Sequence, residues 1–246
     1  MYILSLDSTA IAATVALCDD EKLLSLTTVE NGNTHSQTLL PMVEQTLARF
    51  ELRPTDIELY ACSAGPGSFT GVRIGASTVK GLAFGTIIPC IGVSTLEALA
   101  QNLIGFDGIL CPVMNARRNQ VYNALFECKN GVITRLCEDR AIALDALDEE
   151  LAALTDQPIY LVGDGYDLSL SQLTKCASRI RQTPVLLRTQ NAYSVAQVAL
   201  ALYESGVRTS DSELAPVYLR PCQAERERLE RLEKEQSTTQ GDVSHD

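Results

Sequence analysis

Short apolar runs, rich in β-branched residues, open the chain and predict three strands. Small or polar residues separate these runs, which cover positions 2–7, 12–18 and 22–29. Runs of this length joined by tight turns are typical of paired β-strands. We therefore expect the chain to begin with three neighbouring strands.

A helix over about residues 36–50 follows, because the apolar positions change to a helical spacing. Pro41 leaves the start of this helix open. If Thr38 caps the helix, Pro41 falls in the first turn, where a missing N–H costs little. If Thr34 or Ser36 is the cap, Pro41 lies inside the helix and kinks it. The apolar face consists of Leu39, Leu40, Val43, Leu47 and Phe50.

The rest of the chain repeats this order of elements. The first half continues with a strand at 58–63, a helix at 70–84, a strand at 87–92 and a helix at 94–104. After the turn "GFDG", we expect three strands over 109–139, a helix at 144–154, a strand at 158–162 and helices at 167–178 and 191–205. The segment "ILSLDSTAIAATVAL" near the start has an echo in "ILCPVMNARRNQVYNAL".

This duplicated β-β-β-α-β-α order predicts two similar α/β lobes, each with a mixed sheet and helices. The first lobe should cover residues 1–104 and the second 105–190. We expect the helix at 191–205 to return to the first lobe. Residues 221–246 form a charged tail that should be partly disordered.

Composition limits the function classes. The chain has 246 residues, a net charge of −11 and a pI of about 4.7. An acidic protein is not expected to hold nucleic acid by itself, because phosphate contacts supply most of that affinity. The basic islands Arg117-Arg118 and 179–188 should be solvated or paired. No signal peptide or membrane span is expected, and the eight cysteines are interpreted as reduced thiols of a cytoplasmic protein.

The loop "AGPGSFTG" at residues 64–71 raises the question of phosphate binding. It is neither a Walker A motif nor G-x-G-x-x-G. Glycines before a helix present free N–H groups to an anion, but Ser68 or Thr70 could equally be a structural helix cap. Both readings stay open. Possible weak phosphate or nucleotide contacts are Asp7, Ser8, Thr9, Gly65, Gly67 and Ser68.

The helix after this loop contains three glycines, at positions 71, 75 and 81. Each costs about 1 kcal/mol relative to alanine inside a helix. Such a sequence predicts close approach by another backbone, either within the lobe or from a second chain. We expect Gly75 to contact a partner helix, or the same helix of a second copy, because Gly71 and Gly75 lie one turn apart on one face.

Candidate catalytic groups are few. His35 stands alone, His245 lies in the tail, and neither an HExxH nor a G-x-S-x-G motif occurs. Asp7 ends the first strand, but its counterpart in the second half is Asn115, a poorer Mg²⁺ ligand than a carboxylate. We therefore expect no metal site.

Several motifs in this order resemble the TsaB (YeaZ) family of bacterial tRNA threonylcarbamoyladenosine synthesis. They include "HSQTLLP", "AGPGSFTGVRIGASTVKGLA", "GVSTLEALA", "NARRNQVY" and "PVYLR". The resemblance implies the two-lobed actin/Hsp70/sugar-kinase-like fold and a chain without transferase activity or a cofactor of its own. It implies pairing with a TsaD-type transferase, which acts on the adenosine next to the anticodon in tRNAs that read codons beginning with A.

The family also implies a TsaE-type ATPase in the complex, with ATP and a metal ion on the partner proteins. Contact with tRNA would occur only through the complex, and the isolated chain could form a homodimer. The implied pairing surface is built from the helices near 36–50 and 70–84. Its expected residues are Leu39, Val43, Leu47, Gly71, Val72, Ile74, Gly75 and Val79.

This sequence departs from the family at Asn115 and Gln120, where acids are usual. Two other functions remain as alternatives. A free-standing ATPase or kinase of the same fold would use Asp7 and the glycine loops, including "GDG" at 163–165. A peptidase is the second alternative, against which the missing histidine motifs argue.

Overall fold

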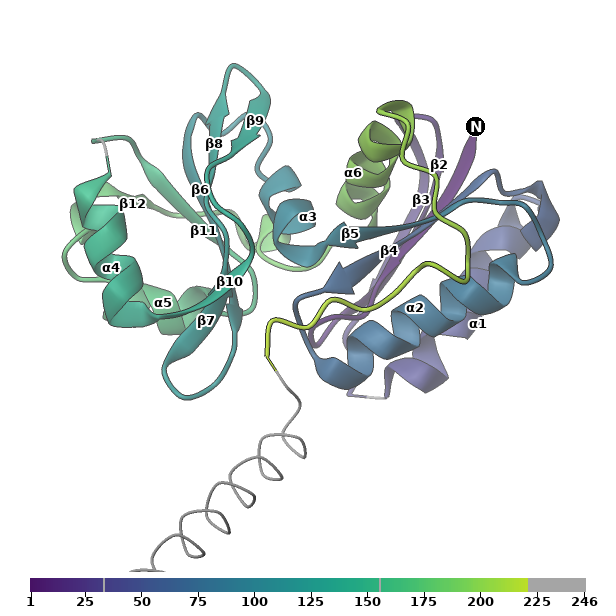
Figure 1. The fold of residues 1–246 in the computed structure, drawn as a ribbon, viewed down its shortest axis with the longest axis horizontal. Coiled ribbons are helices and arrows are strands. Elements are labelled where there is room, and N and C mark those ends of the chain that lie inside the picture. Colours follow the sequence, from purple (N-terminus) through teal and green to yellow (C-terminus); the bar gives the residue numbers. More distant parts are fainter. Residues whose placement is uncertain (33, 155, 221–246) are drawn as a thin grey trace, which may run out of the picture.

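The computed structural model describes residues 1–220, except for residues 33 and 155. The chain forms two α/β lobes side by side (Figure 1). The predicted charged tail after Arg220, which includes His245, lies outside the described residues. The seven described cysteines are free thiols, and six of them are buried.

The first lobe is built on a five-stranded sheet in the order β3-β2-β1-β4-β5. β1 to β3 pair antiparallel, whereas β4 runs parallel to both β1 and β5. All three opening strands agree with the sequence prediction. The bounds are β1 (Tyr2–Asp7), β2 (Ala13–Asp19), β3 (Lys22–Val29), β4 (Leu59–Gly65) and β5 (Cys90–Ser94).

Helices cover both faces of this sheet. α1 (His35–Arg49) and α2 (Phe69–Ala83) lie side by side on one face, where their apolar sides share one core with the sheet (Figure 1). The opposite face carries α6 (Ala192–Glu204), which returns from the second lobe, and α6 also contacts α3 (Thr95–Gln101). A short 3₁₀ turn, η1 (Pro54–Asp56), precedes β4.

Thr34 precedes α1, so Pro41 lies inside the helix, on its exposed side. The alternative in which Thr38 caps the helix is therefore wrong. The predicted strand at 87–92 lies a few residues too early. Ile87 is fully exposed in the loop before β5.

The second lobe has more strands than the sequence predicted. Its sheet runs β10-β7-β6-β11-β12, and β8 pairs with both β6 and β9. Several of these strands are only four residues long, too short for alternation to reveal. The bounds are β6 (Gly108–Asn115), β7 (Gln120–Asn123), β8 (Phe126–Lys129), β9 (Val132–Arg135), β10 (Arg140–Ala143), β11 (Ile159–Val162) and β12 (Ile180–Arg181).

The helices of this lobe are α4 (Leu144–Ala153) and α5 (Tyr166–Gln172), with 3₁₀ turns η2 (Ala177–Arg179) and η3 (Val185–Leu187). α5 ends earlier than the predicted 167–178. The buried carboxylate of Asp148, on α4, accepts hydrogen bonds from the backbone N–H groups of Thr174, Lys175 and Cys176. These bonds hold a turn where the sequence predicted helix.

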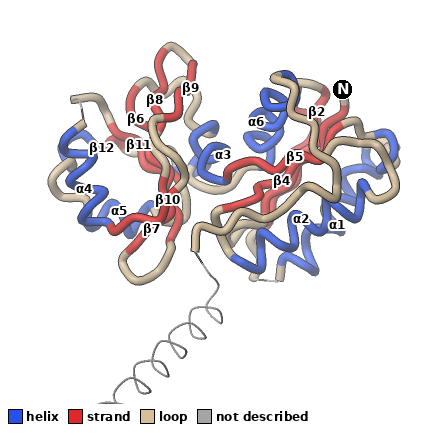
Figure 2. The backbone as a smooth tube through the Cα atoms, in the orientation of Figure 1, coloured by secondary structure: helices blue, strands red, loops and turns tan. Residues whose placement is uncertain are grey.

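After α6, residues 207–220 run back along the first lobe beside α2 and end at the junction of the lobes (Figures 1 and 2). We call this segment the C-terminal strap. It is held against the first lobe along its length. The carbonyl oxygen of Thr209 accepts a hydrogen bond from Cys90 N, and Val217 N donates to Ala64 O at 2.7 Å. Between them, Leu214 is buried in the core. The sequence analysis assigned no element here.

Candidate functional site

Asp7 ends β1, where the turn to β2 faces the second lobe. Its side chain is buried, and its own lobe supplies hydrogen bonds to both carboxylate oxygens. Thr9 donates its N–H and its hydroxyl to Oδ1, each at 2.7 Å, and Ser63 donates to Oδ2 at 2.5 Å. Burial raises the pKa of Asp7, and the bonds from Ser63 and Thr9 oppose that rise. The carboxylate therefore serves first to fold the turn.

The glycine loop is fastened to the same turn. Ser68 caps α2 by accepting from Gly71 N at 3.3 Å, and Ser68 N donates to Thr9 O at 2.7 Å. Ser8 donates its hydroxyl to Gly71 O at 2.9 Å. Ser68, rather than Thr70, is thus the cap of α2, and phosphate binding by the loop stays a prediction. Gly67 and Ser68 line the space between the lobes.

Gly71 and Gly75 are required by packing inside the chain, which corrects the prediction of a partner contact there. A Cβ at Gly71 would overlap the carbonyl oxygen of Ser8, and one at Gly75 would lie 2.9 Å from Ser8 Oγ. Gly81 differs: it is exposed, and nothing lies within 4 Å of a Cβ built on it.

The other predicted interface residues also need correction. Because α1 and α2 turn their apolar sides to the same sheet face, those side chains form the core of the lobe rather than its surface. Ile74 is partly buried against this core. The fully buried members of the predicted set are Leu39, Val43, Leu47, Val72 and Val79. The exposed sides of the two helices carry Leu40, Glu44, Arg73, Ser77 and Gly81.

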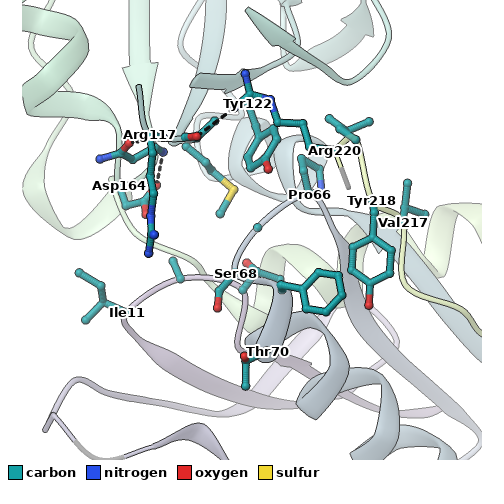
Figure 3. Close-up of a pocket in the computed structure, with 18 residues that line it drawn as sticks. Ile11, Pro66, Ser68, Thr70, Arg117, Tyr122, Asp164, Val217, Tyr218 and Arg220 are labelled. Carbon is teal, nitrogen blue, oxygen red and sulfur yellow. Dashed lines mark hydrogen bonds between the residues drawn. The ribbon is translucent and has the colours of Figure 1, made fainter. Parts of the chain in front are cut away.

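A cavity of about 590 Å³ lies between the lobes (Figure 3). The β1–β2 turn and the start of α2 form one side of it, and the β6–β7 turn forms the other. The strap completes the wall. Its lining includes Thr9, Ile11, Ser68, Thr70, Asn115, Arg117, Tyr122, Asp164, Val217, Tyr218 and Arg220.

Asn115, the predicted counterpart of Asp7, has a structural role in the β6–β7 turn. Its side-chain oxygen accepts from Arg117 N at 2.8 Å, and its own N–H donates to Asp164 Oδ1 at 3.1 Å. Burial raises the pKa of Asp164, and the charge of Asp7 adds to that rise. Asp164 lies in the predicted "GDG" loop. The acid of the second lobe whose charge interacts with that of Asp7 is therefore Asp164, whereas position 115 carries an amide.

The strap carries site residues that sequence reasoning missed. Tyr218 stacks on Phe69 with ring centroids 4.5 Å apart, and Arg73 Nε donates to its hydroxyl at 2.8 Å. Arg220 donates to Ala116 O of the second lobe at 3.1 Å. The available signal was the motif "PVYLR", which the sequence analysis used for resemblance but not for structure.

His35 begins α1, and its Nε2 lies 2.6 Å from Ala10 O, so it helps to place the β1–β2 turn. Across residues 1–220, the described part of the chain, no three His, Cys, Asp or Glu side chains gather in a way that could hold a metal ion.

The chain is similar to proteins of known families. The chain matches the TsaD family, tRNA N6-adenosine threonylcarbamoyltransferase, over residues 29–225. It is 32% identical to the tRNA threonylcarbamoyladenosine biosynthesis protein TsaB of Bacillus subtilis (strain 168), over 94% of this chain and 99% of that protein. The chain belongs to the TsaB (YeaZ) family.

Other TsaB proteins and a solved structure agree. TsaB of Escherichia coli (strain K12) is 31% identical, over 89% of this chain and 95% of that protein. YeaZ from Pseudomonas aeruginosa superposes with a TM-score of 0.70 at 26% identity, covering 89% of this chain and 99% of that one. The predicted family and the actin/Hsp70/sugar-kinase-like fold are thereby confirmed. In the described part of this TsaB-family chain, no helix is long and apolar enough to span a membrane.

Proposed function

We propose that this chain is the non-catalytic subunit of tRNA threonylcarbamoyladenosine synthesis, supporting a TsaD-type transferase that it pairs with. Its TsaB relatives are named for that biosynthesis. In this proposal ATP and the metal ion reside on partner proteins, including a TsaE-type ATPase, and tRNA is bound through the complex in the cytoplasm.

The observation that carries the proposal is the state of Asp7. This residue is the one a catalytic member of the fold would use at the end of β1 to orient a metal-bound phosphate. Here both of its carboxylate oxygens are engaged by Thr9 and Ser63, and the side chain is buried. Freeing it would require breaking the turn that also holds the glycine loop.

The exposed side of α2 supports a place for the partner. Gly71 and Gly75 have an intrachain reason, but Gly81 stands in open space within the helix. It still costs about 1 kcal/mol of helix stability relative to alanine. A close approach by a second chain would account for that cost, and exposed Leu40 on neighbouring α1 would widen the contact.

The test is the affinity of the full chain for the TsaD-type transferase of the same cell, measured by sedimentation. Replacing Gly81 with leucine should hold the two chains apart and weaken binding at least about tenfold. Ala201→Leu is the matched control, because Ala201 is an exposed small residue on α6, which covers the opposite face of the sheet.

Equal affinities for wild type and Gly81→Leu would remove α2 from the pairing surface. A wild-type chain that does not bind the transferase at all would overturn the proposed function. Binding lost in both variants alike would point to a general effect of an added leucine, and would also contradict the placement on α2.

A further inference from the structure

A groove of about 370 Å³ lies on the second lobe and shares no lining residue with the cavity between the lobes. Its walls come from α5 and from the segment that runs through η2 into β12, both in the second lobe (Figure 1). Tyr166, Asp167 and Leu170 line it from α5, and Ile180 and Gln182 line it from the other side. The groove therefore lies between a helix and the last strand of a sheet.

β12 ends its sheet. It runs parallel to β11, and in the described part of the chain no other strand pairs with it. Arg181 and Gln182, at the end of this strand, are exposed. A free sheet edge can accept an extended segment of another chain through main-chain hydrogen bonds, while pockets beside it receive alternate side chains.

Exposed apolar side chains lie around the groove. Leu170 is 46% exposed on the α5 wall. The turn η3 lies between the lining residues Gln182 and Arg188, and it carries Val185 and Leu186, which are 71% and 90% exposed. Exposed apolar residues are ordinary when they are scattered, but a group of them next to a groove marks a contact surface.

The turn η3 is fixed at both ends. The buried Thr183 donates its hydroxyl to Leu161 O at 2.7 Å and accepts from Arg188 Nε at 2.8 Å. The guanidinium of Arg188 lies over the ring of Tyr166, 3.9 Å from its centroid, and Leu187 packs against the core. The exposed side chains of this turn are thus held in place before anything binds, which lowers the entropic cost of binding.

The charge of this face is opposite in sign to that of the whole chain. Residues 168–203 contain four basic residues and no acidic one, although the chain has 31 acidic and 20 basic residues. Arg181 lies on β12 and donates to main-chain carbonyl oxygens, whereas Arg188 and Asp167 place one charge of each sign on the lining. An acidic segment is therefore complementary to the strand edge.

We infer that this face binds an extended segment of another protein in which acidic and apolar residues alternate. Successive side chains of a strand point to opposite faces. Ile180 and Gln182 line the groove and Arg181 does not, so the apolar side chains of the added segment enter the groove and its carboxylates lie on the side of Arg181. The aliphatic surroundings favour a peptide over single-stranded RNA, which is held by aromatic stacking and phosphate contacts.

Fluorescence anisotropy of the full chain with labelled synthetic peptides tests this inference. The probe is a peptide of about eight residues, within the usual length of a strand, in which glutamate alternates with leucine or valine. Its counterpart has lysine in place of glutamate. The acidic peptide should bind saturably with a Kd below about 1 mM, and the lysine peptide at least about tenfold more weakly. Absence of saturable binding in this range, or equal binding of both peptides, would overturn the inference.

Two matched variants locate the binding. Leu186→Asp should weaken binding of the acidic peptide at least about tenfold, because it removes an apolar contact and adds a like charge. Ile87→Asp changes a fully exposed apolar residue of the first lobe in the same way and should leave binding unchanged. Equal losses in both would contradict the placement. Arg181→Gln, with exposed Arg118→Gln as its control, replaces this pair if thermal unfolding shows that Leu186→Asp is misfolded.

Other occupants of the face would give different results. Self-association of the full chain in sedimentation, lost in Leu186→Asp, would assign the face to a second copy. Tighter binding of a synthetic peptide of residues 221–236 than of the alternating peptide would assign it to the chain's own tail. An oligouridylate bound more tightly than the acidic peptide, and weakened by Arg181→Gln, would assign it to RNA. Each of these results overturns the inference, and none of them bears on the proposed pairing through α2.

Discussion

At the scale of single residues, Asp7 is a buried acid whose hydrogen bonds hold the β1–β2 turn. The carboxylate is desolvated, and Ser63 and Thr9 compensate with three hydrogen bonds. Burial disfavours the charged form of an acid, so the folded state raises the pKa above its value in the unfolded chain. Protonation of Asp7 therefore favours the folded state.

The consequence is a pH dependence with a defined sign. The unfolded chain releases this proton at lower pH than the folded chain, so Asp7 adds stability as the pH falls through its raised folded pKa. Asp7→Asn removes this titration. Urea unfolding of both proteins over a pH series that descends through the titration of Asp7 should show wild type gaining stability relative to the variant as the pH decreases. A constant difference between them would contradict the raised pKa.

Two glycines of α2 should respond in opposite ways to the same substitution. Gly71→Ala should lower the free energy of unfolding by about 1–3 kcal/mol, because the new methyl group overlaps the carbonyl oxygen of Ser8. Gly81→Ala should raise it by up to about 1 kcal/mol, since the helix gains propensity and the space is open. Urea denaturation of the isolated chain measures both. Stabilisation by both substitutions would show that the loop and the β1–β2 turn are not packed as described.

At the scale of elements, the strap joins parts of the fold that are distant in sequence. Leu214 enters the core between α2 and the sheet, and Lys80 donates to its carbonyl oxygen at 2.9 Å. Further along, Val217 bonds to the end of β4 and Arg220 reaches the second lobe. The strap thus covers the glycine loop and connects the two lobes on the side away from α3.

The anchoring of the strap depends on one apolar side chain. Leu214→Ala should cost about 2–5 kcal/mol, as for other buried leucines, and Val217→Ala, at a position that is 52% exposed, should cost much less. Thermal and urea unfolding of the two variants would compare them. Similar, small effects would mean that the strap is not part of the cooperative unit.

The sequence predicted the elements whose pattern is local. The three opening strands, α1 and α2 show a clear period of apolar residues or a clear helix cap. Their predicted bounds agree with the observed ones within about two residues, as is usual for element ends. The candidate site was harder to predict from the sequence. The apolar faces of α1 and α2 were read as a surface between chains, although a pattern of buried positions cannot say which chain buries them. The strap and the role of Ser8 arise from tertiary contacts that no local pattern contains.

At the scale of the whole molecule, the two lobes divide the tasks. The first lobe buries the carboxylate of Asp7 and leaves one side of α1 and α2 exposed. The second lobe and the strap bring two arginines to the cavity between the lobes. The family to which this chain belongs is named for tRNA threonylcarbamoyladenosine biosynthesis, and our proposal that the chain supports another protein rests on this arrangement.

The most direct measurement is the amount of threonylcarbamoyladenosine formed in tRNA, by mass spectrometry, when this chain is added to a TsaD-type transferase, a TsaE-type ATPase and the threonylcarbamoyl donor. The account predicts no product from this chain without the transferase. In the full mixture Asp7→Asn should support modification as well as wild type, and Gly81→Leu should support it poorly. Product formed by the chain without the transferase, and abolished by Asp7→Asn, would contradict the account.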